Sequence, residues 1–233
     1  MVSPTPKRGQ PVRAKRKSSS TRIFYLALAL VAVVGIGALT WMSTRPREEA
    51  TVVQIDSTLP KVASNGYVMG SATAPVEVIE FGDFECPYCG QAETSVRELL
   101  TDTEIRYVWR HLPLVDVHPQ AQLAAQATEA ASAQGAFWPM HDRLLQHQDA
   151  LFFDDLIEHA AALGLDVERF RSDLASGAYS TRIAQDVESA DLSGVSGTPT
   201  FFINGQRHYD AYDIETLTTA VSVERQRLAA IGR

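Results

Sequence analysis

The pattern of hydrophobic and polar positions changes along the chain, and each change predicts a different element. Residues 23–42 carry no charged side chain, and the span is long enough for a transmembrane helix, which needs about 20 apolar residues. Residues 76–81 are apolar on both faces except at two glutamates, which is typical of a central strand covered on two sides. Residues 105–110 predict a second strand, and residues 91–100 between them have the period of a helix.

A long stretch of helical period follows the second strand. Aspartates that suit a helix N-cap and glycines that suit a helix end divide it into segments. The predicted helices are about 120–134, about 139–148, one capped by Asp154 or Asp155 and ended by Gly164, one capped by Asp166 and ended by Gly177, and one marked by Tyr179, Ile183 and Val187.

The two-residue repeat that is typical of β-strands returns near the C-terminus. Residues 200–203 predict a strand, and Asn204-Gly205 is a favoured two-residue hairpin turn, so residues 206–209 should pair back. Asp213 then suits the N-cap of a last helix, which extends to about residue 228.

The order of these elements predicts an α/β fold. A strand–helix–strand unit takes about 30 residues, whereas about 90 residues separate the second strand from the third. A small α/β core with an inserted helical bundle is therefore the economical prediction. Residues 61–75 are expected to form a loop or a short hairpin, and residues 43–60 a polar linker.

Charge is distributed unevenly along the chain. Residues 1–22 contain seven basic residues and no acidic one, and their Pro, Ser and Lys/Arg content predicts a disordered tail. Basic residues before an apolar span mark the cytoplasmic side, so residues 23–42 should be a transmembrane anchor and residues 43–233 extracytoplasmic.

A cleaved signal peptide is the alternative to a transmembrane anchor. We favour the anchor because the span is longer than a usual signal sequence and no clean Ala-x-Ala site follows.

The charge of the remaining chain narrows the expected partners. The whole chain has a net charge of −7, so removing the +7 of the tail leaves −14, from 14 basic and 28 acidic residues. An acidic domain argues against a nucleic-acid surface. The compartment outside the cytoplasm is oxidising, which suits a protein that makes disulfides.

The chain has only two cysteines, Cys86 and Cys89, and they form a Cys-Pro-Tyr-Cys sequence between the first strand and its helix. The first turn of a helix has unpaired N–H groups and a positive dipole end, which stabilise a thiolate on the first cysteine. Pro87 suits this turn because no N–H is needed there, and Tyr88 should be exposed beside the pair. The spacing therefore predicts dithiol–disulfide exchange.

Two other interpretations of the cysteines are weaker. A structural zinc site needs four ligands, and the six histidines show no matching ligand spacing. A purely structural disulfide more often closes a longer loop. We expect neither a metal nor a cofactor.

Five motifs follow one another along the chain: Gly70-x-x-x-Ala74-Pro75, the segment from Val76 to Cys89, the segment from Arg106 to Leu114, the segment from His118 to Gln148 with its Phe137-Trp138 pair, and the loop from Gly194 to Thr200. Together and in this order they resemble the motifs of the DsbA-like thiol–disulfide oxidoreductases of the thioredoxin superfamily. The resemblance extends from Gly70 to the C-terminus and implies a thioredoxin fold in residues 61–233, with a helical insertion at about 115–192.

The resemblance also implies roles for single residues. Cys86 would be the attacking cysteine and Cys89 the resolving one, with Pro199 as a cis-proline that faces them. Glu80 matches the buried acid beneath the active site, where it would relay a proton to or from Cys89.

A second set of residues is expected to meet the substrate. They flank the cysteine pair or the proline: Thr198, Tyr88 and Pro87. A backbone at Thr198 left free by a cis bond could pair with an extended peptide, as an added strand does. Cys-Pro-Tyr-Cys differs from the Cys-Pro-His-Cys of the best-known strong oxidants, which leaves the strength of this protein as an oxidant open.

These expectations combine into a function. The first hypothesis is a membrane-anchored enzyme that donates disulfides to reduced exported proteins and is reoxidised by a membrane partner, DsbB-like or vitamin-K-epoxide-reductase-like by resemblance. The second reverses the electron flow and makes the protein a reductase or isomerase. The third, of another class, is an anchored binding or scaffold module with a structural disulfide.

Overall fold

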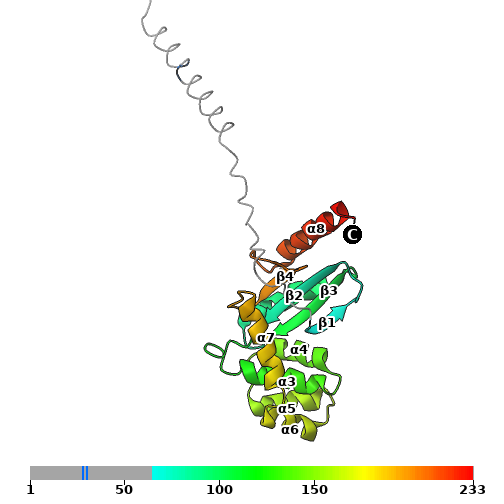
Figure 1. Ribbon diagram of the computed structural model, residues 1–233. Coiled ribbons are helices and arrows are strands. Elements are labelled where there is room, and N and C mark those ends of the chain that lie inside the picture. The colour runs from blue at the N-terminus through cyan, green and yellow to red at the C-terminus, as the bar shows by residue number, and fades with distance from the viewer. Residues whose placement is uncertain (1–27, 29, 31–64, 233) are drawn as a thin grey trace, which may run out of the picture. The chain divides into compact units, whose positions relative to one another are not determined.

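The computed structural model describes residues 28, 30 and 65–232 (Figure 1). The chain divides into two compact units, Met1–Gln54 and Ile55–Arg233, of which the first contributes only the helical residues Leu28 and Leu30 to the description. Apart from these two leucines, the predicted basic tail, anchor and linker lie outside the described residues. Within the described part, none of the helices has the length and apolar content needed to cross a membrane.

The second unit is built on a mixed sheet of five strands in the order β1-β3-β2-β4-β5. Strands β2 and β3 pair in parallel, and the other three pairings are antiparallel. Strand β2 is buried along nearly its whole length, as its apolar sequence predicts, and β3 is buried to the same extent although it contains Arg106, Arg110 and His111. The strands are β1 (Tyr67–Gly70), β2 (Val76–Gly82), β3 (Ile105–His111), β4 (Thr200–Ile203) and β5 (Gln206–Arg207).

Helices cover both faces of the sheet. On one face, α2 (Pro87–Leu99) and α8 (Ile214–Ala230) pack together over side chains such as Val78 and Tyr107. On the other face, α7 (Ser180–Leu192) packs against β3 and closes a smaller apolar cluster. This is a thioredoxin-type α/β arrangement.

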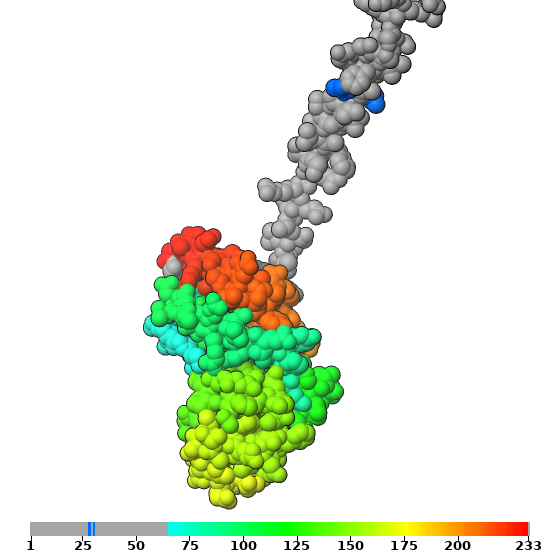
Figure 2. Space-filling view, turned by 180° about the vertical axis from the view of Figure 1, so that it is seen from behind, coloured from blue at the N-terminus to red at the C-terminus, as the bar shows by residue number. Residues whose placement is uncertain are grey.

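The helical insertion lies between β3 and β4 in the sequence. Within residues 65–232, α8 lies at one end of the molecule and the helices of the insertion at the other (Figure 2). Alanines of the first inserted helix are buried at the centre of the bundle, because small side chains let neighbouring helices approach closely. The inserted helices are α3 (Ala121–Ser132), α4 (Phe137–Gln146), α5 (Phe153–Ala162), α6 (Val167–Ser176) and α7.

The predicted helix caps are confirmed at two positions and wrong at a third. The Asp166 and Asp213 side chains accept backbone hydrogen bonds from Arg169 and Thr216, each at 3.0 Å. The helix predicted to be capped by Asp154 or Asp155 instead begins after Phe152, and the Asp155 carboxylate accepts the hydrogen bond of the Phe152 N–H at 3.0 Å. An acidic residue in the first turn can accept a hydrogen bond from a backbone N–H at the start of the helix without being the N-cap residue itself.

The structure differs from the prediction at β1, which lies in the segment expected to be a loop or short hairpin. Tyr67 pairs with Trp109 and Gly70 with Arg106, so β1 is an antiparallel edge strand on β3. A Cβ at Gly66 would lie 2.1 Å from the Trp109 carbonyl oxygen, so only glycine permits this close approach. The strand was missed because it is short and its partner is distant in the sequence.

The C-terminal hairpin forms at the predicted turn. Asn204 has φ 47° and Gly205 has φ 80°, and a turn of this kind requires positive φ at both central residues. The strand after the turn ends at Arg207, earlier than predicted, although the His208 N–H still donates to the Phe201 carbonyl at 2.9 Å.

Candidate active site

The two cysteines lie at the start of α2, below the loop that precedes β4. Cys86 is the N-cap of the helix and Pro87 its first residue, so the proline removes an N–H that would have no partner. Both thiols are free and buried, with 2% of Cys86 and 1% of Cys89 exposed. The Cys86 carbonyl accepts the first helical hydrogen bonds, from the N–H groups of Cys89 at 3.1 Å and Gly90 at 3.3 Å.

The surroundings of the two thiols shift their pKa values in opposite directions. A hydrogen bond from the Cys89 thiol lowers the pKa of Cys86 to about 5, with further help from Thr198 and from the backbone N–H groups of the first helical turn. Burial raises the pKa of Cys89 well above its usual value, and the charge of a Cys86 thiolate adds to the effect. The favoured state at neutral pH is therefore a Cys86 thiolate beside a Cys89 thiol.

The loop from Gly194 to Thr200 covers the pair. The peptide bond between Thr198 and Pro199 is cis, as the sequence resemblance implies. Cys86 Sγ lies 3.4 Å from the Thr198 carbonyl oxygen, so this loop directly contacts the first cysteine.

Glu80 lies in β2 beneath the pair and is 2% exposed. Its carboxyl group accepts a hydrogen bond from the Tyr107 hydroxyl at 2.6 Å. Burial raises the pKa of Glu80 to about 8, partly offset by this hydrogen bond and strengthened by the charges of Glu93 and Cys86. The carboxyl group can therefore bind and release a proton near neutral pH.

The residues expected to meet a substrate surround the pair. Pro87 is exposed, and Tyr88 is 57% exposed. Tyr212, from the segment before α8, was not predicted. Tyr212 is partly buried and packs against the core cluster that contains both cysteines. Nothing in the local sequence indicates this proximity.

Asp83 is a second residue that the sequence analysis missed. Its backbone N–H donates to the Cys89 sulfur at 3.4 Å, and its buried carboxylate accepts from the Glu85 N–H at 2.8 Å and the Leu114 N–H at 2.9 Å. The His118 ring lies 2.8 Å from the same carboxylate. The available signal was the position of Asp83 directly after a buried parallel strand, where polar functional groups often gather.

One group of possible metal ligands occurs among residues 65–232. Oxygen or nitrogen atoms of Glu93, His141 and Asp142 lie within 4.8 Å of one another. Arg97 already bonds to both carboxylates, at 2.6 Å to Glu93 and 2.5 Å to Asp142. The guanidinium group supplies the positive charge that a cation would, so the group is best described as a partly exposed ion-pair cluster.

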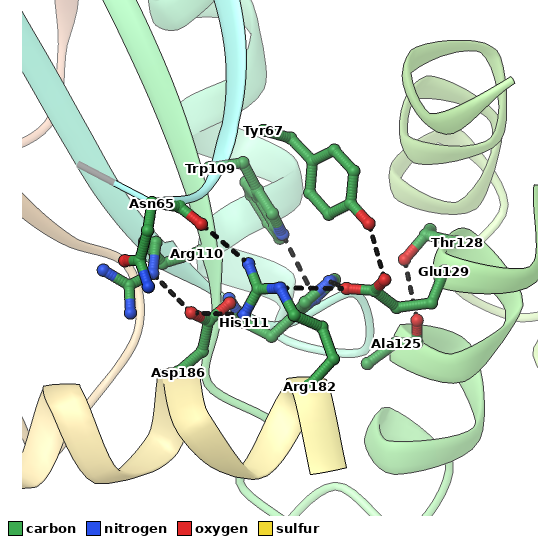
Figure 3. A network of polar contacts seen from close by, with 10 residues as sticks. All are labelled: Asn65, Tyr67, Trp109, Arg110, His111, Ala125, Thr128, Glu129, Arg182 and Asp186. Atoms are coloured by element: carbon green, nitrogen blue, oxygen red, sulfur yellow. Dashed lines mark hydrogen bonds and ion pairs between the residues drawn. The ribbon is translucent and has the colours of Figure 1, made fainter. Parts of the chain in front are cut away.

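A buried polar network joins the sheet to the insertion away from the cysteines (Figure 3). The Glu129 carboxylate of α3 accepts from the Tyr67 hydroxyl at 2.5 Å and contacts His111 Nε2 at 3.1 Å. Trp109 donates to the other ring nitrogen of His111 at 3.3 Å, which makes Nε2 the protonated nitrogen of the neutral ring.

The same network continues into α7. The fully buried Arg110 and Asp186 form an ion pair, and the His111 N–H donates to Asp186 at 3.0 Å. Arg182 also pairs with Asp186, at 2.7 Å. These contacts fix the helical insertion to β3 and hold no group next to the cysteines.

The family described as thioredoxin matches residues 63–222. The crystal structure of a thioredoxin-like oxidoreductase from Silicibacter pomeroyi superposes with a TM-score of 0.63 and 29% identity, over 70% of this chain and 93% of that one. Oxidised BdbD from Bacillus subtilis gives 0.63 with 20% identity, over 71% and 95% of the two chains. Wolbachia pipientis α-DsbA1 gives 0.62 with 18% identity, over 76% and 98%. The last two likenesses show the fold.

The curated relatives are longer proteins. Over 206 residues the chain is 55% identical to a protein of Salinispora arenicola named Na⁺/H⁺ antiporter NhaA 1, covering 83% of this chain and 32% of the relative. A protein of Salinispora tropica named Na⁺/H⁺ antiporter NhaA 3 is 55% identical over 205 residues, covering 82% and 31%. The chain thus spans about a third of the length of these relatives.

Proposed function

This chain belongs to the thioredoxin family, and we propose that it is a thiol–disulfide oxidoreductase of the DsbA-like type that donates disulfides to reduced exported proteins. The observation that carries the proposal is the asymmetry of the cysteine pair. The pKa of Cys86 is lowered to about 5 while that of Cys89 is raised. When the reduced form of a protein holds a stabilised thiolate, its disulfide is readily transferred to a substrate dithiol.

The proposed transfer takes two exchange steps. A substrate thiolate attacks the Cys86 sulfur, a mixed disulfide forms, and the Cys86–Cys89 bond breaks with Cys89 as the leaving thiolate. A second substrate thiolate then attacks the substrate sulfur of the mixed disulfide and releases Cys86 as a thiolate. The substrate loses two electrons and two thiol protons, and the enzyme disulfide gains the two electrons.

Glu80 is proposed to supply the proton that Cys89 needs in the first step. A thiolate is costly at the buried Cys89 position, and a deprotonated Glu80 carboxylate would raise the cost further. A neutral Glu80 with a pKa of about 8 has a proton to give near neutral pH. In the reverse reaction the carboxylate would take the proton back.

Substrate recognition is proposed to use the surface around the cysteine pair. Thr198 contributes backbone groups beside Cys86, where an extended peptide can add as a strand does. Tyr88 and Pro87 are exposed beside the thiol and offer apolar contact to the same peptide. These contacts involve backbone and apolar surface, which suits an enzyme that accepts many substrates.

The proposed location is the outer face of the cell membrane. The support is the sequence: a basic segment at 1–22 followed by an uncharged span at 23–42. The names of the curated relatives, Na⁺/H⁺ antiporters, also favour a place beside a membrane. The proposed reoxidising partner is a membrane protein, DsbB-like or vitamin-K-epoxide-reductase-like.

Two measurements test the function. The oxidised full chain, mixed with a reduced unfolded protein, should form disulfides in that protein and become reduced itself. Alkylation of cells at acid pH, which traps free thiols, should find the chain mainly oxidised. A chain that is mainly reduced in cells and only reduces disulfides would identify a reductase or isomerase instead. A chain without either activity would be a binding module with a structural disulfide.

A further inference from the structure

The carbonyl of Cys86 has a partner from outside its own helix. Gln148 lies in the insertion, just after α4, and its side-chain amide reaches the start of α2. Its Nε2 donates to the Cys86 carbonyl at 2.8 Å and to the Phe84 carbonyl at 2.9 Å. A primary amide has two N–H groups, so both are used on the turn that enters the active-site helix.

A second observation concerns the oxygen of the same amide, which lies close to Gly90. A Cβ at Gly90 would lie 2.5 Å from Gln148 Oε1 and 3.0 Å from its Cδ. Gly90 is in the interior of α2, where glycine is unfavourable for helix stability relative to alanine. The glycine therefore leaves room for Gln148. The side chain cannot simply swing away, because its two hydrogen bonds hold it in place.

These contacts act on the geometry that favours a Cys86 thiolate. The N–H groups of Tyr88 and Cys89 stabilise the thiolate only while Cys86 keeps its extended N-cap conformation. The Gln148 amide donates to the Cys86 carbonyl, which is the part of the Cys86 backbone that leads into α2. This hydrogen bond therefore helps to hold the N-cap conformation. In the oxidised protein the disulfide already constrains the same residue, so loss of Gln148 should affect the reduced form more.

We propose that Gln148 is a positioning residue for Cys86, through which the helical insertion sets the reactivity of the thiol. It touches no reacting atom, and its effect passes through the Cys86 backbone. Gly90 belongs to the same device, because it provides the space that Gln148 needs. The proposal rests on the proposed thiol chemistry of the Cys86–Cys89 pair.

The test uses the full chain with Gln148→Ala, Gly90→Ala and the double variant. Gln146→Ala is the matched control, since Gln146 is exposed at the end of α4. Two readouts need no protein substrate: the pH titration of thiolate absorbance, and the equilibrium between the dithiol and glutathione. Circular dichroism and thermal melting report whether each variant is folded.

Gln148→Ala should move the Cys86 titration midpoint to higher pH. It should also shift the glutathione equilibrium toward the disulfide by about threefold to tenfold, the range expected for one or two hydrogen bonds. Gly90→Ala should shift both in the same direction, although alanine favours the helix. In the Gln148→Ala background, Gly90→Ala should add nothing, because the smaller side chain no longer meets the new methyl group.

Unchanged titration and glutathione equilibrium in folded Gln148→Ala would overturn the proposal and leave Gln148 a purely structural contact. Additive effects in the double variant would overturn the link between Gly90 and Gln148. If Gln148→Ala fails to fold, Gly90→Ala still decides: a titration like that of the wild type contradicts the proposal. Failure of wild-type disulfide transfer would instead contradict the proposed function and leave these readouts intact.

Discussion

At the scale of single residues, the two cysteines differ because their surroundings differ. Cys86 receives hydrogen bonds from the Cys89 thiol and from the start of α2, whereas Cys89 is enclosed by apolar side chains above Glu80. The thiolate charge is therefore favoured at one sulfur and disfavoured at the other. In the proposed mechanism this difference assigns the attacking position to Cys86 and the resolving position to Cys89.

Substitution of the two cysteines should give different outcomes. Cys86→Ser should abolish disulfide transfer, because the attacked sulfur is gone. Cys89→Ser has no active-site disulfide to donate, but its Cys86 thiolate can attack an oxidised substrate, and the resulting mixed disulfide should accumulate because Cys89 is not there to displace the substrate. Non-reducing electrophoresis after acid trapping measures both. Equal trapping by the two single variants would contradict the assignment.

The buried Glu80 should leave a signature in the pH dependence of stability. Its folded pKa of about 8 lies above the ordinary value of 4.5, so the folded state holds the proton more tightly than the unfolded state. The free energy of unfolding that comes from this proton is complete below about pH 4.5 and is lost as pH rises toward 8. Glu80→Gln should remove this loss.

Urea unfolding of wild type and Glu80→Gln from pH 5 to pH 8 measures the effect. The variant should gain stability relative to wild type as pH rises. Glu104→Gln, at an exposed position, serves as the control. A constant difference across this range would mean that Glu80 does not titrate there.

At the scale of elements, buried charges fasten α7 to the sheet. Arg110 of β3 and Asp186 of α7 are both fully buried and pair with each other. Asp186 also accepts the His111 N–H, so one carboxylate satisfies donors from the strand backbone and from two arginines. Removing one member of such a group leaves buried charges without compensation.

Asp186→Ala should therefore lower the free energy of unfolding by about 3–5 kcal/mol, the usual cost of breaking a buried ion pair. Asp191→Ala, at an exposed position in the same helix, should change it by less than about 0.5 kcal/mol. Chemical denaturation of the oxidised chain gives both values. A small effect of Asp186→Ala would show that the network is dispensable for the attachment of α7.

At the scale of the whole molecule, the redox state should be coupled to stability. The Cys86 thiolate exists only in the reduced protein, and its stabilisation at the helix start is lost when the disulfide closes. We expect the reduced protein to be the more stable form at neutral pH. An oxidised form that melts higher would contradict disulfide donation and favour a reductase.

The stability gap between the two redox forms should depend on pH. The folded pKa of Cys86, about 5, lies below its ordinary value of 9.0, so its contribution is complete above about pH 9. The contribution decreases as pH falls and is absent below about pH 5. Thermal melts with and without reductant at several pH values should show the gap narrowing on acidification; a gap independent of pH would exclude the thiolate as its source.

The proposed topology is a further expectation for the whole chain. With residues 1–22 in the cytoplasm, an alkaline phosphatase fused after residue 60 should be active, because that enzyme folds only in an oxidising compartment. A fusion after residue 20 should be inactive and serves as the control. An inactive fusion at normal expression after residue 60 would place the catalytic domain in the cytoplasm.

The sequence by itself determined the elements that depend on local patterns. Strand β2 was predictable because both of its faces are apolar, and the caps at Asp166 and Asp213 because a capping side chain binds N–H groups two or three residues away. The hairpin turn at Asn204-Gly205 needed only its own backbone preferences. The strand–Cys-x-x-Cys–helix context was local as well, and it was sufficient to predict redox chemistry.

Tertiary structure alone decided the contacts between distant segments. Strand β1 forms because the edge of β3 is available for pairing. The sequence of its four residues, which ends in glycine, does not predict this pairing. Gln148 reaches Cys86 across 62 positions, and His118 reaches Asp83 across 35. Local periodicity shows which face of an element is buried, not which neighbour covers it. The packing of the insertion against the active-site loop therefore decides which residues hold the cysteine pair in place.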